Sequence, residues 1–491
     1  MIKSISLENF KSFRNLPQLE LRPLTLLCGA NSSGKSTIFK SIMALKQSYE
    51  TTSSYDNLIL NGGYTTNGFF DDVVFSREGD SFSLSNTFTV SCPFQNGTLQ
   101  VQTPNVQLYK ALRRMYLNNR EYPGSFTFES TTTFGCEAPN RENKIPVIQR
   151  YELAIHMKNM NNTVTSKIVL QRLSSRAKQY SLKWRNLPDI NHKYVSGLVK
   201  QCIAYFYNMQ LSNVYVSSDN LPKDTIISDI LPNIYTLCKL TAEQYQTISY
   251  LGPLRQPPAR AYMYTTETSS IGTSGENTPF VLAQNKNKTV TASLPPITVS
   301  GFAHKNCKRT LFSATQAWIK YMDIDPITID RKSEIVKLRV GNSNIADVGF
   351  GISQVLPIIV EGLSILPEQT LVLEQPEIHL HPNMQMCLAD FLISLINQGK
   401  QVILETHSDH ILNRIIRRIM EDESSFLLDN VSVYYVQKEN NESIVSPIEI
   451  DKIHGIAKCP PDFFSQYTSE VDTIVRTGFE NIKREKRNHA D

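Results

Sequence analysis

A glycine-rich motif near the N-terminus constrains the fold more than any other feature of this sequence. An apolar run at residues 24–28 is followed by GANSSGKST at residues 29–37 and by a helical pattern over residues 38–47. The spacing G-x-x-x-x-G-K-S between a strand and a helix is that of a phosphate-binding P-loop. Its backbone N–H groups and the helix N-terminus both favour an anion. The motif therefore predicts an α/β fold that binds a nucleotide.

The motif also assigns roles to its residues. Lys35 is expected to reach the β- and γ-phosphates, and Ser36 is expected to ligate magnesium. ATP and Mg²⁺ are therefore the expected cofactors. The other residues of the loop are expected to bind the phosphates: Gly29, Asn31, Ser32, Ser33, Gly34 and Thr37. The alternative, a chance glycine-rich turn, is disfavoured by the correct spacing and flanks.

Three further motifs lie far along the chain. Residues 370–382, TLVLEQPEIHLHP, form an apolar strand that ends in Glu374, the expected second magnesium ligand. Upstream, DVGFGISQV at 347–355 opens a helix with a turn that suits an anion, and its expected nucleotide contacts are Gly351, Ser353 and Gln354. Downstream, KQVILETHS at 400–408 places His407 after another buried strand, where a catalytic role is more plausible than simple packing.

This order resembles the ABC-type ATPase heads of SMC, RecF and overcoming-lysogenization-defect proteins. The resemblance implies an α/β head, in which a mixed sheet has flanking helices and a β-lobe. It also implies a head-to-head dimer closed by ATP, in which Gly351 and Ser353 act on the nucleotide of the partner subunit. His407 would then sense the γ-phosphate.

Two adjacent positions depart from the usual motif of these heads, which is Asp-Glu-Pro. Here Glu374 and Gln375 stand at the two acidic positions. Glu374 can still serve magnesium, but Gln375 cannot accept a proton and is a poor general base. Glu377 is the nearest replacement. We expect slow hydrolysis, or hydrolysis that uses Glu377, and therefore an ATP-gated clamp rather than a fast motor.

The pattern between the motifs predicts four segments. Residues 1–185 would be the N-terminal half of the head with the P-loop and β-lobe, and 186–300 an inserted, mainly helical arm with a mobile loop at 265–297. Residues 301–445 would be the C-terminal half of the head, and 446–491 a C-terminal cap with a basic tail. Between arm and loop, Arg255 and Arg260 stand in a Pro-Gly frame that suits phosphate, an acidic partner or a structural ion pair.

Bulk composition narrows the setting. A chain of 491 residues suggests two or three structural units. The apolar runs are too short to span a bilayer, the N-terminus lacks the apolar core of a secretory signal, and the eight cysteines are scattered singly. We expect a cytoplasmic protein without a membrane partner. The net charge of +4 is weak, and two basic clusters near residues 110–120 and 172–185 are read as nucleic-acid contacts or, by preference, as solvated faces.

The wording LENFKSF, YLGPLRQPP, DVGFGISQVLP, LEQPEIHLHP, ETHSDHILNRI and PPDFF resembles a bacterial group of AAA-type ATPases with a C-terminal domain of unknown function numbered 3696. Relatives supply the ATPase subunits of the anti-phage systems Septu, retron-associated Septu and PARIS. The resemblance implies an oligomer that senses infection and controls a separately encoded HNH or Toprim nuclease, with DNA or a retron nucleic acid as a further partner. The alternative is a RecF- or SMC-like ATPase that clamps DNA in repair or chromosome maintenance. A self-sufficient nuclease is disfavoured, because no carboxylate cluster follows the histidine strand.

Overall fold

A seven-stranded sheet forms the centre of the computed structural model, which describes residues 1–51, 57–91, 94–95, 98–99, 125–136, 144–158, 163–174, 179–185, 202–207, 209–216, 231–263, 270–295, 306–460 and 476–477. In order across the sheet, its strands are β13 (Ile248–Leu251), β20 (Thr370–Glu374), β21 (Gln401–Glu405), β3 (Leu24–Cys28), β22 (Val431–Glu439), β23 (Glu442–Asp451) and β24 (Gly455–Lys458). The first five are mutually parallel, and the last two are antiparallel additions. The strand before the P-loop therefore lies between strands from the far end of the chain.

The central strands are buried on both faces. Every residue of β3, β20 and β21 is buried, as expected for parallel strands covered on both sides. Successive residues alternate between two cores: Leu27 and Val372 pack with the β-lobe, whereas Leu26 and Leu371 pack with the helices on the opposite face.

A nine-stranded antiparallel sheet forms the predicted β-lobe. Its order is β12 (Gln210–Val216), β11 (Cys202–Tyr207), β10 (Tyr180–Arg185), β9 (Thr163–Arg172), β8 (Pro146–Lys158), β7 (Ser125–Cys136), β4 (Ser81–Ser91), β1 (Ile2–Phe10) and β2 (Phe13–Glu20). Helix α1 (Lys35–Glu50) contributes to the core shared by this sheet and the central one, and it contacts α6 (Leu231–Gln246). Smaller elements at its side are α2 (Phe70–Val73), η1 (Phe75–Arg77) and the hairpin β5 (Phe94–Gln95) and β6 (Thr98–Leu99).

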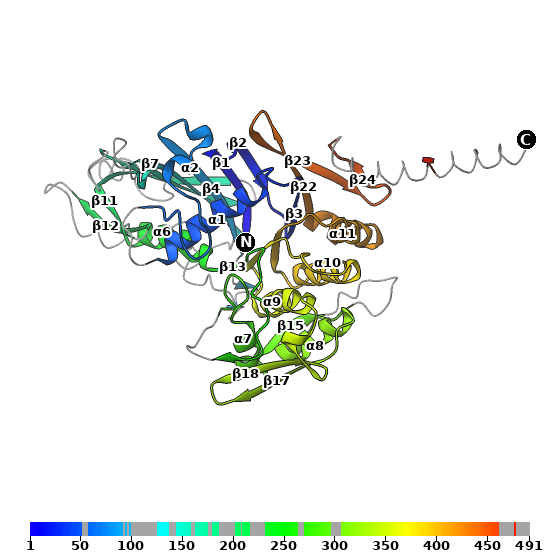
Figure 1. Ribbon diagram of the computed structural model, residues 1–491. Helices are drawn as coiled ribbons and strands as arrows, with labels where there is room; N and C mark the ends of the chain where they lie inside the picture. The colour runs from blue at the N-terminus through cyan, green and yellow to red at the C-terminus, as the bar shows by residue number, and fades with distance from the viewer. Residues whose placement is uncertain are drawn as a thin grey trace, which may run out of the picture.

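Helices cover the other face of the central sheet, as Figure 1 shows. They are α8 (Leu311–Tyr321), α9 (Gly351–Ser364), α10 (Pro382–Ile396), α11 (Asp409–Glu421) and the short α12 (Phe426–Asn430). Beside α8 and α9 lie α7 (Thr278–Gln284), η2 (Ile345–Asp347), the pair β15 (Thr289–Ser293) and β16 (Asn306–Thr310), and the small sheet of β14 (Tyr262–Met263), β17 (Ile327–Lys332), β18 (Ile335–Val340) and β19 (Ser343–Asn344). In the described part of the chain, no helix has the length and apolar character to cross a membrane.

The prediction of a mainly helical arm is wrong for residues 202–216. These residues form β11 and β12, which extend the β-lobe sheet, whereas α6 and α7 of the same predicted segment are helical. Ala204 and Phe206 are buried on one face with a spacing of two, the period of a strand. Phe206 packs edge-on against Tyr180, with ring centroids 4.8 Å apart. An apolar run this short fits a helix or a strand equally well in the sequence.

The mobile loop predicted at 265–297 is also wrong for most of its length. Residues 270–295 contain α7 and β15, and Thr278 donates a hydrogen bond to the carbonyl of Gly275. A Cβ atom at Gly275 would lie 2.6 Å from Pro357, so this segment packs closely on α9. The predicted basic tail lies outside the described residues, and the four segment boundaries stay predictions.

Candidate functional site

The loop between β3 and α1 is shaped by three residues with left-handed backbone. The φ angles are +143° at Gly29, +59° at Ser32 and +110° at Gly34. A Cβ atom would lie 2.1 Å from the Val436 carbonyl oxygen at Gly29 and 2.3 Å from the Ser443 hydroxyl at Gly34, so only glycine fits at both. The first turn of α1 has neither a capping side chain nor an acidic residue. The loop is therefore a cradle open to an anion.

Lys35 places its charge inside this cradle. The side chain is 3% exposed, and its ammonium donates to the carbonyl oxygens of Gly29 (3.0 Å) and Ala30 (2.7 Å). The Glu405 carboxylate lies 3.9 Å away. Burial lowers the pKa of Lys35, and the charge of Glu405 only partly opposes it. The ammonium is thus held by loop carbonyls and can exchange them for phosphate oxygens.

The remaining loop residues differ in their exposure and hydrogen bonding. Asn31 and Ser32 are exposed at the loop surface, whereas Ser33 is 2% exposed and its hydroxyl has no hydrogen-bond partner among the described residues. The N–H of Thr37 donates to the carbonyl of Gly34, and the Thr37 hydroxyl accepts from Ser12 at 3.5 Å.

Two glutamates end neighbouring strands beside the cradle. Glu374 of β20 and Glu405 of β21 are opposite each other in the strand register. The Ser36 hydroxyl donates to Glu405 at 2.8 Å, and the Tyr250 hydroxyl donates to Glu374 at 2.9 Å. Burial raises the pKa of Glu374 to about 7 and also raises the pKa of Glu405. Sequence reasoning missed Glu405, although an acid at the end of a strand beside the P-loop strand was the available signal.

These side chains fit the expected ligands. The hydroxyl of Ser36 and the carboxylates of Glu374 and Glu405 are oxygen donors, which Mg²⁺ prefers. A Cβ atom at Gly29 or Gly34 would collide with neighbouring atoms. Glycine at these positions lets the loop curl so that its backbone N–H groups can approach a phosphate chain.

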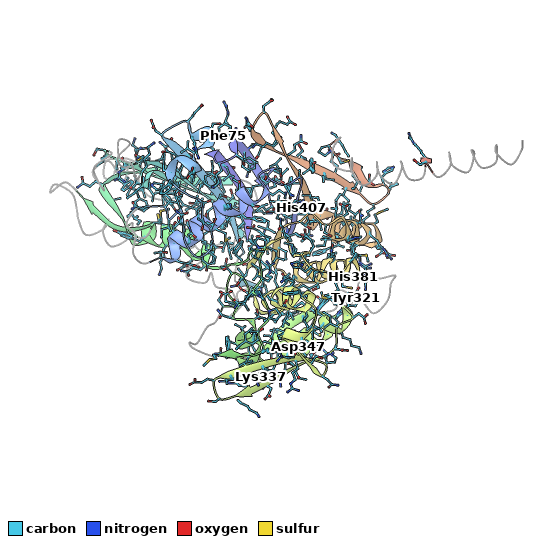
Figure 2. The ribbon with its side chains drawn as sticks, viewed as in Figure 1. Phe75, Tyr321, Lys337, Asp347, His381 and His407 are labelled. Carbon is cyan, nitrogen blue, oxygen red and sulfur yellow. The ribbon has the colours of Figure 1, made fainter. Side chains whose placement is uncertain are left out.

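The loops after β20 and β21 are tied together. The N–H of Gln375, at φ +43°, donates to the carbonyl of Glu405, and the N–H of His407 donates to the Glu377 carboxylate at 2.7 Å. Burial raises the pKa of Glu377. Partial burial, followed by the charge of Lys35, lowers the pKa of His407, so the imidazole favours the neutral form. Figure 2 shows His407 near the central sheet. The structure therefore brings Gln375, Glu377 and His407 together with Glu405.

The residues of the 347–355 motif lie at the start of α9, next to the end of the loop that follows β20. Gly351 begins α9 beside His379 and Met384, and the Ser353 hydroxyl donates to the Phe350 carbonyl at 2.7 Å. Ser353 and Gln354 are mostly buried, whereas Phe350 is 57% exposed. Among the described residues, no hydrogen bond or ion pair joins this turn to the cradle. Figure 2 places Asp347, at the start of the motif, in the lobe below His407.

An open cavity of about 520 Å³ adjoins the cradle on the side of the β-lobe. Ser12 connects the two, because its hydroxyl approaches Thr37 and its carbonyl accepts from the Ser443 N–H. The cavity is large enough for the nucleoside end of a nucleotide, and it was not predicted from the sequence. Its lining consists of Lys11, Ser12, Asp72, Val74, Phe75, Ser76, Arg77, Lys438 and Asn441.

The predicted basic clusters receive little support as nucleic-acid contacts. Arg172 is 5% exposed and donates to the Tyr180 hydroxyl and the Ile148 carbonyl, so it is a structural residue. Lys183 is exposed, but the side chain of Arg185 is not described. The other members lie outside the described residues: Lys110, Arg113, Arg114, Arg120, Arg176 and Lys178.

Sheet order and cradle together define the class of the protein. A P-loop strand next to β21, with the acid-bearing β20 one strand further, and a β-lobe over α1 make up an ABC-type P-loop ATPase head. Residues 1–249 and 265–412 match the family model described as AAA ATPase domain, and the chain belongs to this family.

Solved structures similar to this chain include heads of SMC proteins. The SMC head domain from Thermotoga maritima is 11% identical with a TM-score of 0.35, and the alignment covers 91% of this chain and 99% of that chain. The Smc head domain with an extended coiled coil, bound to the C-terminal domain of ScpA derived from Pyrococcus furiosus, is 10% identical with a TM-score of 0.36, and 91% and 96% are covered. Because these TM-scores are low, the fold assignment rests on strand order and family. No curated protein matches the chain significantly in sequence.

Proposed function

We propose that this chain is a slow ATPase that acts as a nucleotide-gated switch, and that its closed state is a head-to-head dimer. One observation carries the proposal. Hydrogen bonds join the phosphate cradle to the acids beside it, whereas among the described residues no hydrogen bond joins Gly351 or Ser353 to the cradle. A site divided in this way is completed when a second copy supplies the missing turn, and a closed twofold pair completes two such sites at once.

Each residue has a role in this proposal. Lys35 binds the β- and γ-phosphates, and Ser36, Glu374 and Glu405 hold the metal. Bound Mg²⁺ neutralises charge on the phosphates. Tyr250 orients Glu374 through its 2.9 Å hydrogen bond, and His407 faces the terminal phosphate.

Slow turnover follows from the residue that replaces the usual general base. Gln375 cannot take a proton from the attacking water. Glu377 is the proposed substitute, because its carboxylate is buried beside His407 and its pKa is raised toward the range useful for a base near neutral pH. A base three residues beyond Glu374 on the loop after β20 is a poorer arrangement than one next to the metal ligand.

Mixing two inactive variants tests the divided site. Lys35→Ala destroys the cradle, and Ser353→Arg blocks the turn at α9, so neither homodimer has a working site. A mixed dimer retains one site that is intact in both halves, so an equimolar mixture should recover about a quarter of the parent ATPase rate. No recovery on mixing, or full activity of the Ser353→Arg homodimer, would contradict the divided site.

The proposed biological role is that of an oligomeric subunit of a bacterial anti-phage system. It would sense infection and control a separately encoded nuclease of the HNH or Toprim type. The motif wording described above supports this role, and its test is affinity purification from cells that carry the native gene neighbourhood. A nuclease that co-elutes with the parent, and whose association changes with Lys35→Ala, supports it. Chromosomal DNA as the sole ligand favours the DNA-clamping ATPase instead.

A further inference from the structure

Arg255 is a buried cation without a partner. The residue is only 6% exposed, and none of its three guanidinium nitrogens has a hydrogen-bond partner among the described residues. Buried charged side chains are normally paired, because an unpaired one loses its hydration without compensation. Arg260, five positions later, shows the ordinary arrangement: it is exposed and forms a two-pronged ion pair with Asp347. An acceptor is therefore missing at Arg255 and not at Arg260.

The backbone carries Arg255 to the edge of the sheet where the acids stand. β13 is parallel to β20 with Leu251 opposite Leu373, so the loop that bears Arg255 starts beside Glu374. Tyr250, on the same strand, is already bonded to Glu374. Arg255 thus belongs to the rim of the nucleotide site in its own chain.

The loop around Arg255 is held firmly on both sides. The N–H of Gly252 donates to the Thr273 carbonyl at 2.8 Å, and the N–H of Gln256 donates to the Ser274 carbonyl at 2.9 Å. Two prolines follow at 257 and 258, which restrict the backbone further. The guanidinium is therefore set in place before any ligand arrives, which reduces the entropy lost on binding.

The charge of Arg255 persists at neutral pH. Burial lowers its pKa to about 10, while Tyr250 and the carboxylates of Glu374 and Glu377 oppose the decrease. Those carboxylates attract the guanidinium through space but do not accept a hydrogen bond from it. An oxygen-rich anion that entered between them would satisfy all of its donors, and a guanidinium matches phosphate geometry with paired N–H groups.

We propose that Arg255 is a ligand of the terminal phosphate of ATP held on the P-loop of the same chain, and that it distinguishes ATP from ADP. This inference rests on the proposed nucleotide site. Lys35 reaches the phosphates from the cradle, and Arg255 contacts only the group that ADP lacks. Removal of Arg255 should therefore weaken ATP and spare ADP.

Calorimetric titration with ADP and with adenylyl imidodiphosphate, a non-hydrolysable ATP analogue, tests the inference. Arg255→Met removes the charge at similar length, Arg255→Lys keeps the charge without the paired donors, and Arg260→Met is the matched control on the same segment. We expect Arg255→Met to weaken the analogue about tenfold or more and to change ADP affinity less than about twofold. Arg255→Lys should lie in between, and Arg260→Met should match the parent.

Equal weakening of both nucleotides, or no change in either, would overturn the role of Arg255. Without nucleotide, Arg255→Met should melt at or above the parent midpoint, because it removes an unpaired buried charge. A variant that fails to fold would show instead that the guanidinium supports the empty fold, and would also overturn the inference. Failure of the proposed site and failure of this inference give different results. A parent chain that binds neither nucleotide, or a Lys35→Ala variant that binds both as the parent does, refutes the site itself. A parent that binds both nucleotides, with no loss of discrimination in the Arg255 variants, refutes only the inference.

Discussion

Asp390 is the charge on which the helical layer behind the central sheet depends. It lies in α10 at 0% exposure and accepts hydrogen bonds from Tyr321 of α8 (2.7 Å), Arg414 (2.7 Å) and Arg418 (2.8 Å) of α11. Burial alone would raise the pKa of Asp390, but the hydrogen bonds from Arg418 and Arg414 outweigh it and hold that pKa below its usual range. One carboxylate thus joins three helices.

Asp390→Asn should destabilise this layer strongly. The side-chain exposures are 1% for Arg418 and 14% for Arg414, so loss of the carboxylate removes an ion pair from two largely buried guanidinium groups, although Arg418 keeps its pair with Glu421. Removal of one partner from a buried ion pair costs about 3–5 kcal/mol. The matched control is Asp347→Asn, whose pair with Arg260 is exposed and should contribute less than about 1 kcal/mol.

A single tryptophan can report the unfolding of this layer. Trp318 is fully buried, and its ring packs 5.7 Å from Tyr321 and 5.1 Å from Phe391. The chain has two tryptophans, so Trp184→Phe leaves Trp318 as the only indole. Urea titrations of both variants in this background measure the change in free energy of unfolding. Equal shifts of less than about 1 kcal/mol for Asp390→Asn and Asp347→Asn would refute the reasoning.

Three further predictions concern the loop, a buried lysine and the proposed base. Gly29→Ala should abolish ATP binding and lower the thermal midpoint, because its Cβ would lie 2.1 Å from a β22 carbonyl oxygen. The control Gly63→Ala places a Cβ with nothing within 4 Å, so it should change neither ATP binding in calorimetry nor the midpoint in thermal melts. Burial lowers the pKa of Lys400 to about 7, so above that pH the unfolded chain holds a proton that the folded chain has released. The free energy of unfolding, relative to that of Lys400→Met, should therefore rise by about 1.4 kcal/mol per pH unit between pH 7 and 9. A difference that does not change with pH in urea titrations would contradict this. Glu377→Gln should slow single-turnover hydrolysis by about 10² or more, and Gln375→Glu should speed it; parent-rate hydrolysis by Glu377→Gln would remove Glu377 from the mechanism.

The strand–loop–helix unit at the P-loop could be predicted in detail because its chemistry is local. Gly29 and Gly34 belong to a fixed local spacing, although the residues that approach them most closely, Val436 and Ser443, lie on β22 and β23, and Glu374 ends an apolar run that is buried throughout. Residues 202–216 were mispredicted, because the burial pattern of β11 becomes visible only when β10 is alongside. Residue spacing along the chain identifies a local motif such as the P-loop, but it does not show which strands pair in the sheet.

The site was predicted less completely, because adjacency between distant strands is not written in the sequence. Glu405 bonds to Ser36 only because β21 lies between β20 and β3. Arg255 and Arg260 shared three interpretations, a phosphate contact, an acidic partner and a structural ion pair, and Arg260 proved to hold an ion pair. The distinction between the two arginines is a matter of burial, which depends on how 270–275 packs over the loop.

The two faces of the central sheet divide the proposed work of the site. α1, which carries Lys35 and Ser36, packs in the core shared with the β-lobe, whereas α10 and α11, which follow the loops of Glu377 and His407, pack in the opposite core. Capture of the phosphates therefore depends on one core and alignment for hydrolysis on the other. A defect confined to the helical layer, such as the loss of the carboxylate that joins α8, α10 and α11, should then reduce turnover while ATP binding by the cradle persists, because the contacts that shape the cradle come from β22 and β23 and not from those helices.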